Sequence, residues 1–173
     1  REKIVNEYFD GNAAVANAIL PTGIPGHAED TAGYDFDLDL ARQTLADAGY
    51  PDGVTVTASV TEGSGAQQIF QILQQDYAQA GITLDIELID GSTWTEQRST
   101  GNCQIYLLNW YADYIDADMF LYLIYHSSMS TFYSTGFADP WFDEQVQLGR
   151  TLDADEKAEF YSALDRYLCS EQY

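Results

Sequence analysis

The sequence predicts an α/β fold in which a mixed sheet, built on a βαβ unit, is flanked by helices. Residues 54–60 are rich in β-branched side chains and lie between Gly53 and Gly63, which is typical of a strand. Residues 82–89 alternate apolar with acidic or polar side chains, the pattern of a half-exposed strand. Residues 65–80 carry apolar side chains at helical spacing between these strands. A strand, a helix and a strand in this order predict a right-handed crossover.

Two further elements extend this unit. A short helix is expected over residues 93–100, with Ser92 or Thr93 as its N-cap. Residues 103–110 predict a third strand, and the apolar run at 105–108 indicates that this strand is more buried than the second. We therefore expect the third strand to join the same sheet.

The N-terminal part divides into a helix-and-loop segment at residues 1–33 and the start of an α/β body at residues 34–173. The first segment begins with a short helix pattern and continues as a loop rich in proline and glycine. The body opens with a helix that Asp37 or Asp39 is expected to cap and that Gly49 ends.

The remainder of the chain is expected to be helical. Residues 118–125 are apolar and aromatic, and residues 140–149 form a helix preceded by Asp139, with proline at its first position. Residues 153–169 open with an aspartate N-cap. Four large aromatic side chains are expected in the core: Trp94, Trp141, Phe142 and Tyr161.

The composition is that of a folded, strongly acidic protein. The chain has 173 residues, of which 46% are hydrophobic, with 28 acidic and 7 basic residues and a net charge of -21. Such a charge repels phosphate backbones and anionic lipid, so it argues against nucleic-acid binding and against docking on a membrane surface. The sequence contains no apolar run long enough to cross a bilayer.

Both ends of the sequence have the pattern expected of a truncated chain. The chain opens on a helix pattern without an initiator methionine or a signal peptide, and it stops just after a helix pattern. We therefore expect the chain to be a fragment or mature piece of a longer protein.

Two cysteines, Cys103 and Cys169, lie far apart and have no spacing typical of a zinc site. They are either two buried thiols or one disulfide that ties a strand to the last helix. A disulfide, which we favour, would place the protein in an oxidising, extracytoplasmic compartment.

The loop that follows the third strand is the main candidate for a ligand site, because ligands of open α/β sheets bind beyond the carboxyl ends of strands. Asp113 lies there among aromatic side chains, where a carboxylate needs hydrogen-bond donors or a cation. Partners within the protein are the ordinary explanation, but basic residues are few. A cation that arrives with a ligand is therefore favoured. The candidate contact residues are Asn109, Trp110, Tyr111, Ala112, Asp113 and Tyr114.

A second loop, at residues 61–65, joins the first strand to the following helix and adds Glu62 and Gly63 as candidates. Its backbone N–H groups could meet an anion at the helix N-terminus. The phosphate-loop pattern is missing, and taken alone the loop is better explained as a plain turn.

Catalysis is not expected. Asp113 and Asp116 could serve a hydrolase as a pair of carboxylates, which is the alternative from another functional class. The sequence shows no nucleophile motif or metal triad, and His27 and His126 are expected at the surface or as caps. The sequence therefore predicts neither a cofactor nor a metal site.

Four stretches, in this order, resemble the C-terminal lobe of the family 5 solute-binding proteins that serve peptide ABC importers. Residues 39–53 are similar to the family's Asp-x-x-x-Ala-x-x-Leu-Leu-x-x-Ala-Gly-Tyr-Pro-x-Gly, and residues 73–84 to its Leu-x-x-x-Gly-Ile step. Residues 109–114, Asn-Trp-Tyr-Ala-Asp-Tyr, are similar to its Gly-Trp-x-Ala-Asp-Tyr signature, with Asn109 in place of glycine. Residues 137–143 resemble its Asn-Pro-x-Phe-Asp step.

This resemblance implies a type II periplasmic-binding-protein fold, with residues 1–173 as a truncated C-terminal lobe of a two-lobed receptor that closes by a hinge. It also implies that Asp113 pairs with the α-ammonium of a peptide, which is a charge-assisted hydrogen bond. Trp110 would pack beside this pair and lower the local dielectric.

The resemblance further implies the partners: a peptide ligand, permease subunits in the membrane and the missing N-terminal lobe. It also implies an extracytoplasmic protein, either periplasmic or lipid-anchored at the cell surface. Longer peptides are favoured, because Arg98 is the only basic residue between Arg42 and Arg150 and a fixed clamp for a peptide carboxylate needs one. The family also contains receptors for oligosaccharides and metal complexes. In a sugar receptor, Trp110, Tyr111 and Tyr114 would stack on rings.

Overall fold

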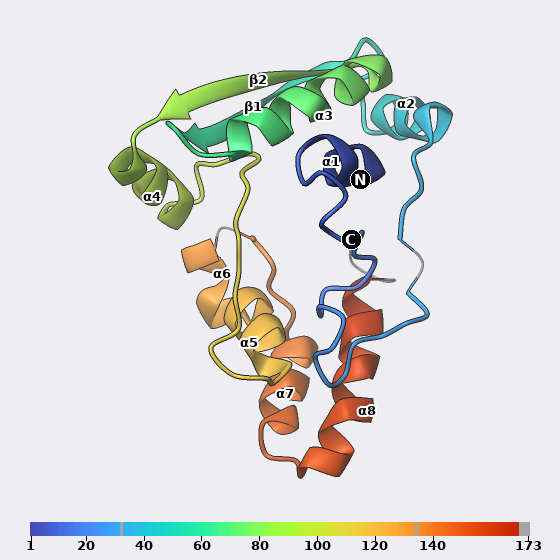
Figure 1. Cartoon of the computed structure of the whole chain (residues 1–173), viewed down its shortest axis with the longest axis vertical. Coiled ribbons are helices and arrows are strands. Elements are labelled where there is room, and N and C mark those ends of the chain that lie inside the picture. Colours follow the sequence, from blue (N-terminus) through green and yellow to red (C-terminus); the bar gives the residue numbers. More distant parts are fainter. Residues whose placement is uncertain (32, 134, 170–173) are drawn as a thin grey trace. The chain divides into compact units, whose positions relative to one another are not determined.

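A computed structural model describes residues 1–31, 33–133 and 135–169 of the chain (Figure 1). The described residues fall into two compact units. The first consists of residues 1–15, 35–98 and 102–108, and the second takes in residues 16–34, 99–101 and those from 109 onward. The two units are described separately below.

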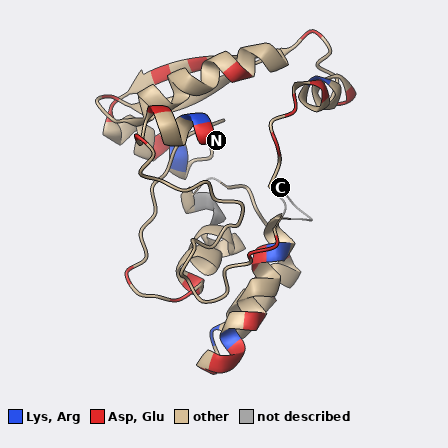
Figure 2. Ribbon diagram, turned by 45° about the vertical axis from the view of Figure 1, so that its right-hand side comes forward, with Lys and Arg blue, Asp and Glu red and all other residues tan. Residues whose placement is uncertain are grey.

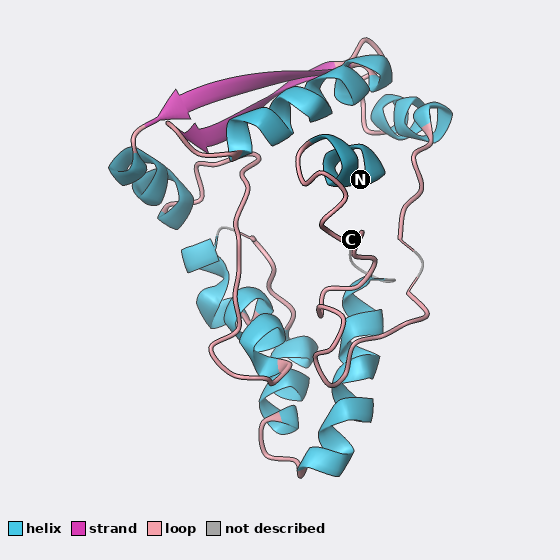
Figure 3. Cartoon of the chain, in the orientation of Figure 1, coloured by secondary structure: helices cyan, strands magenta, loops and turns pink. Residues whose placement is uncertain are grey.

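The first unit is built on the predicted βαβ crossover. Strands β1 (Val54–Thr61) and β2 (Ile82–Ile89) pair in parallel, with Val54 opposite Ile82 and Thr61 opposite Ile89. Helix α3 (Ala66–Ala80) connects them and packs against both strands (Figure 3). The core between sheet and helix consists of Ala58, Val60, Phe70 and Leu84. The α/β class and the two strands predicted from the sequence are therefore confirmed.

Two glycines allow both strands to start side by side. Gly53 and Gly81 precede β1 and β2 and have φ angles of 94° and 90°, in the left-handed region that side chains rarely adopt. A Cβ atom on Gly53 would lie far inside van der Waals contact with the carbonyl oxygen of Gly81. Glycine at position 53 is thus required both by its own backbone conformation and by the neighbouring strand.

Three shorter helices complete the first unit: α1 (Glu2–Glu7), α2 (Leu38–Asp47) and α4 (Gly91–Ser99). Asp37 caps α2, as one of the two predicted choices, by accepting the N–H groups of residues 39 and 40 at 3.0 and 2.9 Å. The predicted cap of α4 was wrong. Asp90 accepts the N–H groups of Ser92 and Thr93 at 2.9 and 3.1 Å, because a carboxylate one turn earlier reaches the free donors.

The predicted third strand is reduced to a single bridge. Ile105 pairs in parallel with Ala58 through two backbone hydrogen bonds of 2.9 and 3.2 Å. On the N-terminal side of this bridge, the next hydrogen bond of a parallel ladder would come from the N–H of Thr57. This N–H instead donates to the side-chain oxygen of Gln104 at 2.6 Å. The expected burial was also wrong, since Leu107 and Leu108 are each 36% exposed.

The second unit is helical in the part that the structure describes. It contains α5 (Asp118–Phe120), the π-helical turn η1 (Leu121–Tyr125), α6 (Ser127–Tyr133), α7 (Pro140–Gly149) and α8 (Ala154–Tyr167). Asp139 caps α7 and Pro140 occupies its first turn, as predicted. Asp153 is at the cap position of α8, although its side chain makes no capping bond. The core residues of this unit are Leu20, Ala117, Met119, Phe120, Leu121, Phe137, Phe142, Val146, Tyr161, Leu164 and Leu168.

Two of the four aromatic residues predicted for the core do not lie fully within it. Phe142 and Tyr161 are buried as expected, whereas Trp94 is only half-buried. Trp141 is 49% exposed, and its ring lies against that of Tyr167 on α8, with ring centroids 4.7 Å apart.

Acidic side chains occur over both units, whereas lysine and arginine are sparse (Figure 2). Among the helices of the described chain, none has the length and apolar character needed to cross a membrane.

Candidate ligand-binding site

The candidate loop at residues 109–114 belongs to the second unit and is anchored by its tryptophan. The indole N–H of Trp110 donates to the carbonyl oxygen of Met119 at 2.9 Å. The same ring makes an edge contact with Tyr133, at 5.6 Å between centroids, and is half-buried. The loop is therefore tied to α5 and α6, and only part of the indole face remains open.

Most side chains of the loop are exposed, including Tyr114 at 53%. Tyr111 and Ile115 are 80% and 76% exposed, and Asp113 between them is exposed as well. Ala112 is half-buried. Asp113 is therefore open to solvent, and its expected place among aromatic side chains stays a prediction.

Asp113 differs from its neighbours in having no counter-ion. Within residues 1–31, 33–133 and 135–169, its side chain takes part in no hydrogen bond or ion pair. The described ion pairs of lysine and arginine all involve other carboxylates: Lys3 with Asp76, Arg42 with Asp39, Arg150 with Asp118, Lys157 with Asp116 and Arg166 with Asp30.

Asp116 and Asp118, which follow on the same segment, each contact a cation. Lys157 Nζ lies 2.8 Å from Asp116 Oδ2. Burial alone would raise the pKa of Asp116, but the hydrogen bonds from Lys157 and from the Asp118 N–H outweigh it, so the pKa is lowered. Arg150 Nε lies 3.3 Å from Asp118 Oδ2, and the Tyr114 hydroxyl donates to the same oxygen at 3.2 Å.

These contacts also act on two phenols. Burial, and then the Asp118 carboxylate, raise the pKa of Tyr114. Burial and the nearby Asp116 raise the pKa of Tyr161 in the same direction. Both phenols therefore stay protonated at neutral pH and can act as hydrogen-bond donors. The hydrolase alternative rested on Asp113 paired with Asp116, but Lys157 holds Asp116 as a structural anion.

The second predicted loop belongs to the first unit. The backbone N–H of Glu62 donates to the carbonyl oxygen of Ile89 at 3.0 Å, and the Glu62 side chain is exposed. Gly63 follows with φ of 73° in a tight turn that leads into α3. Glu62 and Gly63 therefore lie on a different unit from Asp113, and their contact with a ligand stays a prediction.

Both cysteines are free thiols in the structure, Cys103 in the first unit and Cys169 in the second. Burial, followed by the Asp165 carboxylate, raises the pKa of the Cys169 thiol. A disulfide between them stays a prediction, which a thiol count on the denatured, unreduced protein would test.

A Ser–His–Asp grouping lies in the second unit and was not visible in the sequence order. His126 is buried, its Nδ1 accepts the N–H of Ser128 at 3.1 Å, and Asp143 Oδ1 lies 3.8 Å from the same nitrogen. Asp143 in turn binds the N–H of Ser127 at 2.8 Å. A catalytic relay needs serine and aspartate on opposite ring nitrogens. Both groups meet Nδ1 here, so the grouping serves as a cap, as expected for His126.

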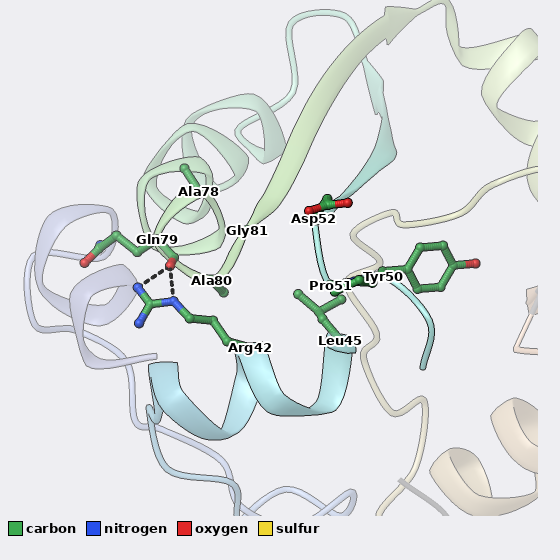
Figure 4. A pocket seen from close by; sticks show the side chains of 10 residues that line it. Arg42, Leu45, Tyr50, Pro51, Asp52, Ala78, Gln79, Ala80 and Gly81 are labelled. Atoms are coloured by element: carbon green, nitrogen blue, oxygen red, sulfur yellow. Dashed lines mark hydrogen bonds between the residues drawn. The ribbon is translucent and has the colours of Figure 1, made fainter. Parts of the chain in front are cut away.

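A pocket of about 290 Å³ occupies the opposite end of the first unit's strands from Glu62 (Figure 4). Arg42 crosses it and donates to the carbonyl oxygen of Gln79 from Nη2 and Nε, at 2.7 and 3.1 Å. The guanidinium thereby caps the C-terminal end of α3. The pocket is lined by Arg42, Leu45, Tyr50, Pro51, Asp52, Gly53, Ala78, Gln79, Ala80 and Gly81, and includes no predicted site residue.

Comparison with known proteins decides the family. The family model described as "Bacterial extracellular solute-binding proteins, family 5 Middle" matches residues 1–132. The chain belongs to this family. The glutathione-binding protein GsiB of Escherichia coli K12 is 30% identical to it over 176 residues, which cover 94% of this chain and 34% of GsiB.

Solved structures place the fold among the type II periplasmic binding proteins. The binding protein DppA from Helicobacter pylori, in complex with the peptide STSA, aligns with a TM-score of 0.86 and 23% identity. The alignment covers 96% of this chain and 33% of DppA. A dipeptide-binding protein from Pseudoalteromonas sp. SM9913, in complex with Met-Leu, aligns with a TM-score of 0.85 and 21% identity, over 97% of this chain and 35% of that protein. The chain thus spans about a third of the length of these relatives.

Proposed function

We propose that the chain is part of a peptide receptor in which Asp113 binds the α-ammonium group of the ligand. The observation that carries this proposal is that Asp113 is exposed and, within the described residues, has no counter-ion. A carboxylate of this kind can form a charge-assisted hydrogen bond with an incoming ammonium group. The names of the relatives support a peptide ligand, since GsiB is a glutathione-binding protein and DppA is in complex with a peptide.

Neighbouring side chains fit the same role. Trp110 is fixed by its bond to Met119 and presents part of its ring, so a ligand that covers the loop would exclude water beside Asp113. Tyr111 is exposed and free to contact a peptide side chain or backbone. Glu62 and Gly63, in the first unit, remain proposed ligand contacts of that unit.

The complete protein would then act as the extracytoplasmic binding component of a peptide ABC importer and deliver its ligand to the membrane permease. The family's description as extracellular supports the location. A second, N-terminal lobe would supply the other side of the cleft. The fact that the chain aligns with only 34% of GsiB supports this part of the proposal. In this proposal the protein binds its ligand without converting it.

Replacement of Asp113 tests the proposal directly. Asp113→Asn keeps the shape of the side chain and removes its charge, so peptide binding by the complete protein should weaken by about 2–5 kcal/mol, the cost of leaving one partner of a desolvated charge pair unmatched. Glu144→Gln removes an exposed charge on α7 of the same unit and should leave the affinity unchanged. Equal affinities in calorimetric titrations of wild type and Asp113→Asn would refute the role of Asp113.

Mass spectrometry of ligands that co-purify with the complete protein separates the remaining classes. A peptide supports the proposal, whereas an oligosaccharide or a metal complex would indicate one of the other receptor types of the family. Cleavage of a peptide during prolonged incubation with the protein would support the hydrolase alternative.

A further inference from the structure

Within the second unit, the segment that carries Asp113 forms ion pairs with two basic residues that come later in the sequence. Lys157, in the first turns of α8, contacts Asp116 at 2.8 Å. Arg150, just after α7, contacts Asp118 at 3.3 Å. Both basic residues lie more than thirty positions later in the sequence, so the attachment is tertiary and not a feature of the loop itself.

Asp116 closes the turn and binds the cation with the same carboxylate. Its Oδ1 accepts the N–H of Asp118 at 3.1 Å, while its Oδ2 accepts from Lys157. Its own N–H donates to the carbonyl oxygen of Tyr114 at 3.0 Å. The side chains of Asp116 and Lys157 are only 23% and 24% exposed, so the pair is shielded from much of the solvent.

The second attachment uses a ring as well as a charge. The guanidinium carbon of Arg150 lies 4.5 Å from the centroid of the Tyr122 ring, which restricts where the cation can reach. From that position it meets Asp118 Oδ2, the oxygen that also accepts from Tyr114. The two attached carboxylates follow Asp113 by three and five residues, and Tyr114, which contacts the second of them, directly follows Asp113.

These contacts leave one of the three carboxylates on the segment without a cationic partner in the part of the chain that the structure describes. Of the three carboxylates at positions 113, 116 and 118, two have a cation at ion-pair distance and the first does not. The pairs fix the backbone on the C-terminal side of Asp113, and the bond between Trp110 and Met119 fixes it on the N-terminal side. Asp113 is thus an exposed charge on a backbone that is held on both sides.

We propose that Lys157 and Arg150 are positioning residues for Asp113, holding its carboxylate where a ligand ammonium can meet it and neutralising the two carboxylates that would otherwise compete for that ammonium. This inference rests on the proposed function and adds to it two residues that no ligand needs to touch. A positioned carboxylate binds more tightly than a mobile one because less conformational entropy is lost on binding.

A double-mutant cycle on the complete protein, titrated with a tetrapeptide that has a free N-terminus, tests this role. Lys157→Met keeps the aliphatic stem and removes the charge. It should weaken binding about tenfold, within the range of coupling energies measured inside one ion-pair network. In an Asp113→Asn background the same change should alter the affinity less than about twofold, because the group to be positioned has lost its charge.

Two control variants separate positioning from general damage. Lys157→Arg keeps the cation and should restore most of the affinity. Lys3→Met breaks an ion pair with Asp76 in the first unit, at 3.2 Å and with similar exposure, and should leave the affinity unchanged. Should Lys157→Met fail to fold, as judged by its near-ultraviolet circular dichroism, Asp116→Asn replaces it in the cycle, with the same expected dependence on Asp113.

The outcomes distinguish the two proposals. An equal loss from Lys157→Met with and without the Asp113 charge, or no loss in either background, overturns the positioning role. If Asp113→Asn by itself leaves the affinity unchanged, the proposed function fails before the cycle is completed. A tenfold loss that depends on Asp113 and that Lys157→Arg reverses supports the inference.

Discussion

Asp165 on α8 accepts the backbone N–H of Leu20 at 3.1 Å, although 145 positions separate the two residues. The same carboxylate accepts the N–H groups of Ile19 and Ala28, at 2.9 and 3.0 Å. Asp165 and Leu20 are both fully buried. One charged group therefore satisfies three donors of a proline- and glycine-rich loop that has no regular structure of its own.

Removal of this carboxylate should unfold the second unit more easily. Asp165→Ala leaves buried N–H groups without acceptors and should lower the free energy of unfolding by about 3–5 kcal/mol. Asp165→Asn, which keeps one acceptor oxygen, should cost less. Urea denaturation measures both, with Glu159→Ala on the exposed face of α8 as the control. A loss below about 1 kcal/mol for Asp165→Ala would contradict the account of this loop.

The close approach of Gly53 and Gly81 predicts an unequal response to alanine at two similar glycines. Gly49→Ala and Gly53→Ala both place a side chain at a φ angle near 90°, which costs about 1–2 kcal/mol. A Cβ on Gly49 meets no atom within 4 Å, whereas a Cβ on Gly53 clashes with the neighbouring backbone. Gly53→Ala should therefore cost about 1–3 kcal/mol more than Gly49→Ala. Equal losses in thermal unfolding would show that the strands can separate at no cost.

The ion pair between Lys157 and Asp116 predicts a pH-dependent contribution to stability. The pKa of Asp116 is lowered in the folded protein, so the unfolded chain binds the proton more readily. The stabilisation is present above the ordinary aspartate pKa of about 3.9 and is lost as the pH falls through the lower folded pKa. Lys157→Met should thus cost about 1 kcal/mol at pH 7, since about a quarter of each side chain is still exposed. The cost should shrink as the pH falls below the ordinary aspartate pKa.

Denaturant titrations of wild type and Lys157→Met across this range measure the difference. The difference in free energy of unfolding between the two proteins should narrow as the solution is acidified. Lys3→Met, which breaks the ion pair with Asp76 in the first unit, serves as a comparison. A gap that stays constant with pH would mean that Lys157 stabilises the unit by packing and not by its charge.

The sequence predicted those parts of the fold that local chemistry determines. Period-two alternation located β2, and capping residues such as Asp37 and Asp139 located helix starts, because these signals act within a few residues. The third strand failed because a ladder needs both partners: the Thr57 N–H bonded to the Gln104 side chain instead. An apolar run indicates a tendency to pair, and it does not show which donors remain available.

The candidate site also has features that the sequence predicted and features that depend on tertiary packing. The order of Trp110 and Asp113 within one motif identified the loop. Whether Asp113 or Asp116 carries the unmatched charge depends on Lys157, which only the packing of α8 brings near. The same limit explains why the Ser–His–Asp grouping around His126 was missed, since its members come from two helices and the turn before them.

The central claim is that Asp113 binds a ligand ammonium, and calorimetric titration of the complete protein with one tetrapeptide in two forms tests it most directly. The peptide with a free N-terminus should bind at least about thirtyfold more tightly than its N-acetylated form, since acetylation removes the charge that Asp113 is proposed to meet. Equal affinity for the two forms would contradict the claim.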